Sequence, residues 1–424
     1  MELIQNLLAN QLFFSVIMMA VGLGVIAGVS APFAILFERK LSGWIQDRIG
    51  PNRVGPWGVL QPVADGVKFL MKEDITPAHV DKPVFIMAPF ISMIVALIGF
   101  AVIPWAGEIH FPWMDEGATV RTQVANLNVG VLYMLSVASL GVYGVVLGAW
   151  ASNNKYAFYG GIRATAQMIS YEVPLGLGVL VVILIGGTLE LDKIVYAQAQ
   201  SGVWNIFLHP VAFVLVLTAA FAETNRTPFD LAEAEQELVG GYHTEYSAMK
   251  FAAFFLAEYS HMATNSALVI VLFLGGWAPL PFLSFWSPEH TWWNVGWLAA
   301  LIKFGCFFGK IAAFLVFYIV IRWTVPRFRF DQLMRLAWKG MVPLAIGALV
   351  LQVLMTALGF IIRPERGFAG NLPTVLFALA GNAVLIGLAM FVTARSTREV
   401  TGRQDNLPAV GNRNANAKLS GIIQ

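Results

Sequence analysis

Residues 84–105 read VFIMAPFISMIVALIGFAVIPW, a run of 22 residues without a charged side chain. An α-helix needs about 20 predominantly apolar residues to cross the hydrocarbon core of a bilayer. This stretch alone therefore predicts a transmembrane helix. Similar apolar runs bring the predicted spans to nine, near residues 12–37, 84–105, 127–150, 165–187, 206–223, 250–275, 297–321, 340–360 and 372–394.

The composition of the 424-residue chain is typical of a membrane protein. Hydrophobic residues make up 58% of it and charged residues 12%, about half the roughly 25% of soluble domains. The net charge of +2 gives no support for nucleic-acid binding. We therefore predict an all-α fold, a polytopic transmembrane helix bundle that forms a single domain over residues 1–394. The polar residues 395–424 are expected to form a mobile tail.

The distribution of Lys and Arg predicts the orientation of the bundle. Basic residues concentrate in the cytoplasmic loops of membrane proteins. If the N-terminus lies outside, the inner loops and the tail hold 21 of the 27 basic residues and the outer loops hold four. We therefore expect nine spans, with the N-terminus outside and the C-terminus inside.

The first inner loop contains a predicted amphipathic helix over residues 57–73. Its apolar positions at helical spacing are Leu60, Val63, Val67 and Leu70. Its opposite stripe is polar and consists of Gln61, Asp65, Lys68 and Lys72. This pattern is typical of a helix at the membrane surface, and equally of a helix packed on the bundle.

The third inner loop is unusually acidic. Its carboxylates, which surround Arg226, are Glu223, Asp230, Glu233, Glu235, Glu237 and Glu245. If a helix begins near Pro228, one of its faces carries Asp230, Glu233 and Glu237. Repulsion between these like charges would raise their pKa values. Carboxylates that exchange protons near neutral pH suit a proton relay. A solvated acidic loop is the simpler alternative.

Five ionisable residues lie within the predicted spans: Glu172, Glu258, His261, Lys303 and Lys310. A charged side chain is costly there unless it is paired or hydrated. Ion pairs that lock helices together would explain one such residue, whereas five beside an acidic loop favour a proton path. The six histidines show no metal-ligand spacing, and Cys306 is the only cysteine. We therefore expect no metal, no catalytic residue and no cysteine-ligated iron–sulfur cluster within this chain.

Three long signatures carry a resemblance to a known family. The first is ERK at 38–40, followed by QDRIGPNRVG at 46–55 and QPVADGVK at 61–68. The second is ETNRTPFDLAEAE at 223–235, continued by residues 245–259, and the third is PRFRFDQ at 326–332. They resemble the quinone-site membrane subunit (the H subunit) of respiratory complex I, the NADH:quinone oxidoreductase, and the resemblance covers about residues 10–360 in order. The ninth span and the tail extend beyond the eight-span members of that family.

The resemblance implies a function in the bacterial cytoplasmic (inner) membrane. Quinone, ubiquinone or menaquinone, would be the substrate and would enter a tunnel from the lipid. Its headgroup would reach a site shared with peripheral-arm subunits near the last iron–sulfur cluster. Its reduction would drive proton translocation in small and antiporter-like membrane subunits. This chain alone would bind no flavin, haem or iron–sulfur cluster.

The resemblance also assigns roles to individual residues. The quinone-binding candidates are Arg39, Arg48, Asp65, Arg226, Phe254 and Phe255. The proton-relay candidates are Glu172, Glu223, Asp230, Glu233, Glu235, Glu237, Glu245, Glu258 and Lys310. Three other functions are alternatives. A membrane-bound hydrogenase subunit would share the fold without a quinone site. A secondary transporter is disfavoured because no internal repeat is visible, and a passive docking anchor leaves the carboxylates unexplained.

Overall fold

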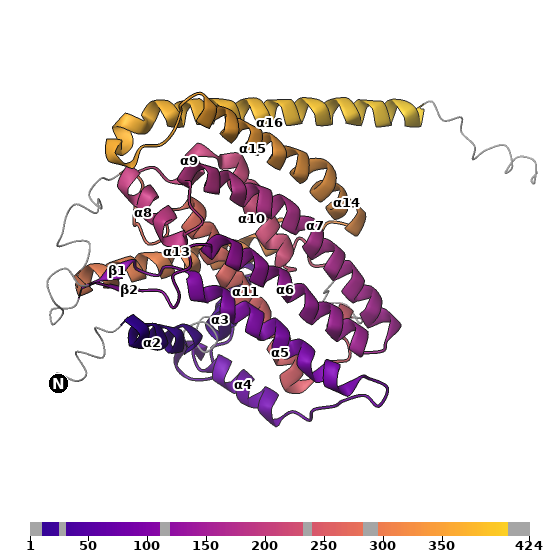
Figure 1. The fold of residues 1–424 in the computed structure, drawn as a ribbon. Helices are drawn as coiled ribbons and strands as arrows, with labels where there is room; N and C mark the ends of the chain where they lie inside the picture. The colour runs from indigo at the N-terminus through magenta and orange to yellow at the C-terminus, as the bar shows by residue number, and fades with distance from the viewer. Residues whose placement is uncertain (1–10, 25–30, 111–118, 232–239, 283–295, 406–424) are drawn as a thin grey trace, which may run out of the picture.

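The computed structural model describes residues 11–24, 31–110, 119–231, 240–282 and 296–405. These residues form a bundle of long helices (Figure 1). The α-helices are α2 (Gln11–Leu23), α3 (Ala31–Ile45), α4 (Gln61–Met71), α5 (Lys82–Ile98), α6 (Gly130–Ala151), α7 (Lys155–Gly186), α8 (Leu191–Ser201), α9 (Asn205–Leu208), α10 (Pro210–Glu223), α11 (Ala248–Phe273), α13 (Trp297–Thr324), α14 (Phe330–Arg335), α15 (Val342–Ala357) and α16 (Gly367–Asp405).

Shorter elements complete the described part of the chain. Two short strands, β1 (Glu108–Ile109) and β2 (Val120–Arg121), pair antiparallel. A π-helical turn over Leu336–Met341 joins α14 to α15. The 3₁₀ turns are Pro56–Gly58, Gly99–Val102, Gly241–His243 and Pro364–Arg366.

Helix α7 illustrates how local sequence sets the ends of these helices. The Asn154 side chain accepts a hydrogen bond of 2.9 Å from the backbone N–H of Tyr156 and so caps the N-terminus. At the other end Gly187 adopts a left-handed φ of 63°, a conformation that ends helices and that glycine adopts readily. Between these caps the helix packs against α6, α10 and α15 at the centre of the bundle.

Six helices are long and apolar enough to cross a membrane, within the part of the chain that the structure describes. They are Lys82–Val102, Gly130–Ala151, Lys155–Gly186, Trp297–Thr324, Phe330–Ala357 and Gly367–Val392. Each overlaps one of the nine predicted spans, which confirms an all-α, multi-pass membrane protein. Of the other three predicted runs, one is divided between α2 and α3, one is shortened in α10, and one carries several polar side chains in α11. The number nine and the orientation remain predictions.

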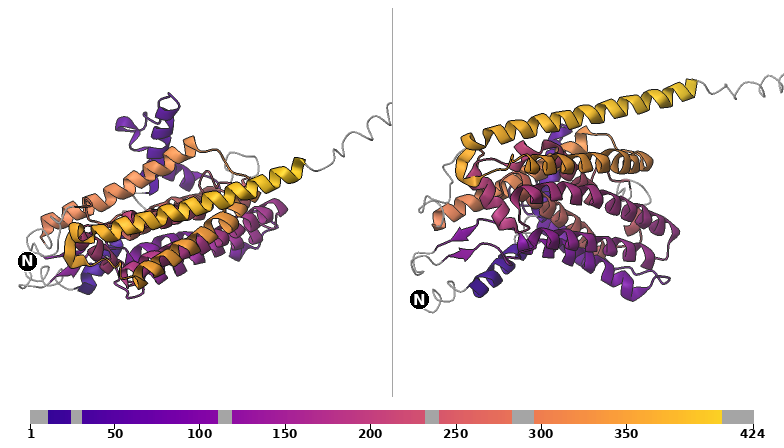
Figure 2. Two further views of the ribbon diagram at one scale, coloured as in Figure 1. Left: turned by 90° about the horizontal axis from the view of Figure 1, so that it is seen from above. Right: turned by 45° about the horizontal axis from the view of Figure 1, so that its top comes forward.

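The predicted amphipathic helix exists as α4, but its two faces are not arranged as a simple membrane-surface helix. Figure 2 shows that the segment containing α4 projects from the bundle. The side chains of Val63 and Leu70 are 63% and 68% exposed. Asp65, on the polar stripe, instead forms an ion pair with Arg39 of α3. The polar stripe therefore contributes to an internal contact.

Two further expectations differ from the structure. Residues 228–231 form turns, so the helix expected to begin near Pro228 does not begin there. Asp230 therefore does not start a helical row of carboxylates, and Glu233, Glu235 and Glu237 lie outside the described residues. Helix α16 runs beside α15 (Figures 1 and 2) and continues past residue 394 to Asp405, into the segment expected to be the tail.

Candidate functional site

A cavity of about 1140 Å³ lies between α3, α4, α5 and α11. Most of its wall is apolar and includes Ile35, Phe69 and Phe255. On one side Arg39 and Asp65 form an ion pair at 2.6 Å, with about half of the Arg39 side chain exposed. A large apolar cavity with a few polar groups is typical of a site for a small amphipathic molecule.

A second polar group of this cavity belongs to the first turn of α11. The Lys250 ammonium lies 3.0 Å from a carboxylate oxygen of Asp74 and donates a hydrogen bond of 2.6 Å to the Thr76 hydroxyl. His243 also lines the cavity, and burial lowers its pKa. The imidazole is therefore neutral at neutral pH, whereas Lys250 supplies a positive charge to the wall.

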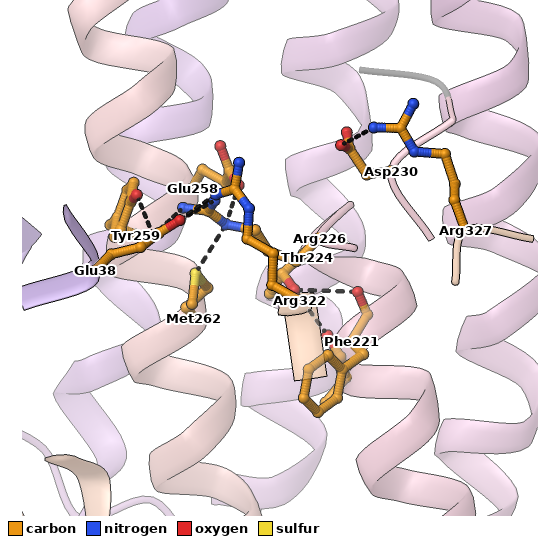
Figure 3. A network of polar contacts seen from close by, with 11 residues as sticks. Glu38, Phe221, Thr224, Arg226, Asp230, Glu258, Tyr259, Met262, Arg322 and Arg327 are labelled. Carbon is orange, nitrogen blue, oxygen red and sulfur yellow. Dashed lines mark hydrogen bonds and ion pairs between the residues drawn. The ribbon is translucent and has the colours of Figure 1, made fainter. Parts of the chain in front are cut away.

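A buried ionic cluster joins α3, α11, α13 and the loop after α10 (Figure 3). Arg226 Nε is 2.6 Å from a Glu258 carboxylate oxygen, and Arg226 Nη2 is 3.4 Å from Glu38. Glu38 also contacts the Arg322 guanidinium and accepts a hydrogen bond of 2.6 Å from the Tyr259 hydroxyl. Two arginines thus neutralise two glutamates across segments that are far apart in the sequence.

Arg226 is held as a charged group in this cluster. Its side chain is only 10% exposed, and its guanidinium lies 4.4 Å from the centroid of the Tyr259 ring. Burial alone would lower the pKa of Arg226, but Glu258, Tyr259 and Glu38 together raise it well above its usual range. Because a buried ion pair is strongly destabilised when one partner is removed, the charges of the cluster depend on one another.

The cavity and the cluster occupy adjacent positions on the same two helices. On α3, Arg39 lines the cavity and the preceding Glu38 belongs to the cluster. On α11, Phe255 lines the cavity and Tyr259, one turn later, belongs to the cluster, with ring centroids 5.0 Å apart. The cavity and the cluster are therefore formed in part by neighbouring residues of α3 and α11.

A smaller cavity of about 60 Å³, apolar over most of its lining, adjoins Glu258 and also touches Glu223 and His261. Glu223 lies 3.4 Å from His261 Nε2 and accepts a hydrogen bond of 3.1 Å from Asn265. This volume exceeds the roughly 15 Å³ that one water molecule needs, and Glu223, Glu258 and His261 supply polar atoms to the lining. The structure thus brings Glu223, Glu258 and His261 around one space.

The remaining relay candidates lie in separate polar contacts. Glu172 accepts a hydrogen bond from the Ser139 hydroxyl of α6. Glu245 accepts one of 2.6 Å from Asn154. Asp230 pairs with Arg327 at 3.1 Å and not with Arg226 of its own loop (Figure 3).

The quinone-binding candidates are divided between these spaces. Arg39, Asp65 and Phe255 line the large cavity. Phe254 is buried and borders the smaller cavity, whereas Arg226 lies in the ionic cluster. Arg48 is exposed away from the cavity wall, and its Nε donates to the Gln46 side chain.

Sequence reasoning missed three members of the cluster: Glu38, Tyr259 and Arg322. Glu38 and Tyr259 stood within the quoted signatures but received no role. Arg322 was counted only as an inner-loop charge, although it ends the apolar run of α13. The available signal was that Glu38 and Arg322 each end an apolar run with a charge.

Fold and site together define a helical membrane protein in which a buried ionic cluster borders a large, mostly apolar cavity. A sequence model of the NADH dehydrogenase family matches residues 17–353. The chain therefore belongs to the NADH dehydrogenase family.

Similar proteins include three that are named as the H subunit of NADH-quinone oxidoreductase. The one from Leptospira biflexa serovar Patoc is 49% identical over 325 residues, which are 75% of this chain and 88% of that protein. A relative from Koribacter versatilis is 47% identical over 337 residues, which are 77% of this chain and 92% of that protein. A third, from Cytophaga hutchinsonii, is 46% identical over 318 residues, which are 75% of this chain and 90% of that protein. The resemblance found in the sequence is confirmed.

Proposed function

We propose that this chain is the membrane subunit that binds quinone and couples its reduction to proton translocation in an NADH:quinone oxidoreductase. The observation that supports the proposal most directly is that Arg39 and Glu38, consecutive on α3, belong to the cavity and to the ionic cluster respectively. The names of the relatives support the same enzyme. The complex would be a proton-translocating oxidoreductase of the bacterial cytoplasmic membrane.

The large cavity is suited to a quinone with an apolar tail. Its wall offers aromatic and aliphatic side chains over most of its length, and two charged pairs, Arg39–Asp65 and Lys250–Asp74. Guanidinium and ammonium groups stabilise negative charge that develops on oxygen during reduction. Arg39 and Lys250 are the cations of the wall that would contact quinone oxygens as the headgroup passes toward the peripheral-arm subunits and their last iron–sulfur cluster.

Coupling would follow from electrostatics in the cluster. Two unit charges 4 Å apart interact by about 4 kcal/mol at an effective dielectric constant of 20. A new charge in the cavity would by the same kind of interaction alter how Arg226 is shared between Glu38 and Glu258, which lie 3.4 and 2.6 Å from it. Released from Arg226, Glu258 would bind a proton more readily.

A proton taken up by Glu258 would pass to Glu223 through the 60 Å³ cavity that both residues line. His261, 3.4 Å from Glu223, would assist the transfer. We propose that Glu172 continues this path and that Glu245, Asp230 and the loop residues Glu233, Glu235 and Glu237 supply it with protons. The antiporter-like membrane subunits would receive the resulting charge displacement.

A substitution that fills the cavity tests the quinone site. Ala252 lines the cavity on α11, so Ala252→Trp should lower quinone reductase activity in native membranes. NADH oxidation by a hydrophilic acceptor such as ferricyanide, which bypasses quinone, should be unchanged. The matched control is Val214→Trp, at a position of α10 that is 56% exposed. Unimpaired quinone reduction by Ala252→Trp would refute the assignment of this cavity to quinone.

A further inference from the structure

The Lys310 side chain of α13 ends in a set of backbone carbonyls. Its ammonium donates to the carbonyl oxygens of Leu274, Gly276 and Ala278 at 2.7, 2.9 and 2.5 Å. The ring of Trp204 lies on another side, with its centroid 4.3 Å from Nζ. Lys310 was expected to join the proton relay, but its hydrogen-bond partners here are three backbone carbonyls that do not titrate.

The conformation of the segment that follows α11 explains why these carbonyls converge. Gly275 and Gly276 have φ values of 68° and 53°, in the left-handed region that glycine adopts without strain. The Gly275 carbonyl, which lies between those of Leu274 and Gly276 in the sequence, instead accepts a hydrogen bond of 2.9 Å from the N–H of Ala278. The alternate carbonyls at 274, 276 and 278 are thereby left to face one point.

Neighbouring helices fix this conformation. A Cβ atom on Gly275 would lie 2.5 Å from Trp204 Nε1, and one on Gly276 would lie 2.6 Å from a methyl carbon of Val195. The N–H of Gly275 is also held by the Gln198 side chain at 3.2 Å. The three carbonyls are thus preorganised, which is the condition for a selective cation site.

We infer that Leu274–Ala278 forms a carbonyl cage for one ammonium-type cation, that Lys310 is its tethered occupant, and that this residue acts as a fixed positive charge. An ammonium group has three N–H donors, one for each carbonyl, whereas a neutral amine has two. Loss of the proton would leave one carbonyl without a donor, and an unsatisfied buried acceptor is destabilising. The three carbonyls therefore favour the protonated form of Lys310.

Through these contacts Lys310 helps to fix the position of α11. This helix carries Phe255 of the large cavity and Glu258 of the cluster nearer its N-terminal end, and Lys310 holds the segment at its C-terminal end. Lys303, two turns earlier on α13, lies 4.4 Å from the Trp277 ring of the same segment. Lys310 is therefore a positioning residue, and this conclusion does not depend on the proposed quinone function.

Chemical rescue tests the cage. Native membranes carrying Lys310→Ala are solubilised in mild detergent and heated, and the fraction of the chain that stays unaggregated is measured. We expect aggregation several-fold faster than in the wild type, largely reversed by ammonium chloride but not by choline chloride at the same ionic strength. The control is Lys339→Ala, because Lys339 is exposed. Aggregation at the wild-type rate, or faster aggregation without an ammonium response, would overturn the inference.

A second variant separates a fixed charge from a proton carrier and also serves if Lys310→Ala does not assemble. Lys310→Arg retains a positive charge that does not titrate in proteins. We expect its ratio of protons pumped to NADH oxidised to equal that of the wild type, even where less complex assembles. Electron transfer that continues without pumping would show that Lys310 carries protons and would contradict the inference.

Discussion

Arg226 Nε lies 2.6 Å from a carboxylate oxygen of Glu258, joining the loop after α10 to the middle of α11 in a site where both side chains are largely buried. The same guanidinium lies 3.4 Å from Glu38 of α3. One side chain therefore connects a loop and two helices that the sequence separates widely, and the charge of each glutamate depends on it.

Removal of Arg226 should destabilise the protein strongly. Arg226→Met leaves Glu258 with a buried charge, and breaking a buried pair typically costs about 3–5 kcal/mol. We expect less chain in membranes and faster aggregation on heating, with part of the loss recovered in the double variant Arg226→Met/Glu258→Gln. Arg335→Met is the control. Arg335 pairs with Asp331, and the two side chains are 71% and 59% exposed. Such exposed pairs contribute at most about 1 kcal/mol to stability. Equal effects of Arg226→Met and Arg335→Met would show that the cluster is not a buried network.

Glu223 should be needed for proton transfer but not for assembly. Glu223→Gln keeps the size of the side chain and a carbonyl oxygen for the hydrogen bond from Asn265, but it removes the exchangeable carboxylate. Proton pumping driven by NADH should fall by at least about tenfold, while ferricyanide reduction and the amount of assembled complex stay unchanged. Glu108→Gln, on β1 and away from this cavity, should pump normally. Normal pumping by Glu223→Gln would exclude the proposed path.

Arg39 should affect quinone binding more than stability. The Arg39–Asp65 pair is 46% and 22% exposed, and partly exposed pairs contribute about 0.2–1 kcal/mol to stability. We therefore expect Arg39→Met to raise the KM for a soluble quinone several-fold without faster heat aggregation. Arg39→Lys, which keeps the charge, should show a smaller increase. A change in stability with an unaltered KM would mean that Arg39 serves only to hold α4 against α3.

Asp192 on α8 should make stability depend on pH. Burial, opposed by Arg121 and assisted by Glu108 and Glu190, raises its pKa from 3.8 to about 6. Lys303 of α13 also lowers this pKa, and Tyr196 lies one turn away on α8. Because the pKa is higher in the folded state than in the unfolded state, the stability contribution is complete below about pH 4 and is lost as the pH rises through 6.

The measurement for Asp192 is the rate of heat aggregation of the detergent-solubilised protein between pH 4.5 and 7.5. Asp192→Asn removes the titrating group and should flatten the part of the pH dependence that lies below about pH 6. Glu365→Gln, a change of the same kind at an exposed position on another loop, should retain the wild-type dependence. Identical pH profiles for the wild type and Asp192→Asn would disprove the assignment.

Asn382 should anchor α16, which lies beyond the residues matched by the family. Its side-chain amide donates to the carbonyls of Leu208 and Ala378 at 2.9 and 2.8 Å, and only 1% of the residue is exposed. Asn382→Leu should destabilise the packing of α16 by about 1–3 kcal/mol, measured as faster proteolytic cleavage between α15 and α16. Val384→Leu, at a position 62% exposed, should cleave like the wild type. Equal cleavage of the two variants would show that Asn382 does not hold α16.

Much of the chemistry of the site could be predicted from the sequence. Glu223, Glu258 and His261 were selected because an ionisable side chain within or beside an apolar run needs a partner or water, and the structure places all three around one cavity. Arg39 and Asp65 were selected from the signatures, and both line the large cavity. Arg48 was selected in the same way and lies elsewhere, since a motif does not specify which side of a turn a side chain occupies.

The pairing of charges could not be predicted. Glu38 and Arg322 are 284 residues apart, and nothing in their local sequence indicates that they meet. Asp230 was expected on a helix with other carboxylates, yet it lies in a turn beside Arg327. Lys310 is a predicted relay residue, and it contacts carbonyls exposed by two left-handed glycines. Each of these contacts depends on how distant segments pack.

The sequence by itself determined that this protein is a helical membrane bundle, because apolar runs near 20 residues long have few other stable structures. It also determined the family, through signatures that fix residue types at many positions in order. Only the tertiary structure decided which charges neutralise one another and where the cavity lies. The reason is that Coulomb interactions and burial depend on distances between helices, which arise from packing and not from spacing along the chain.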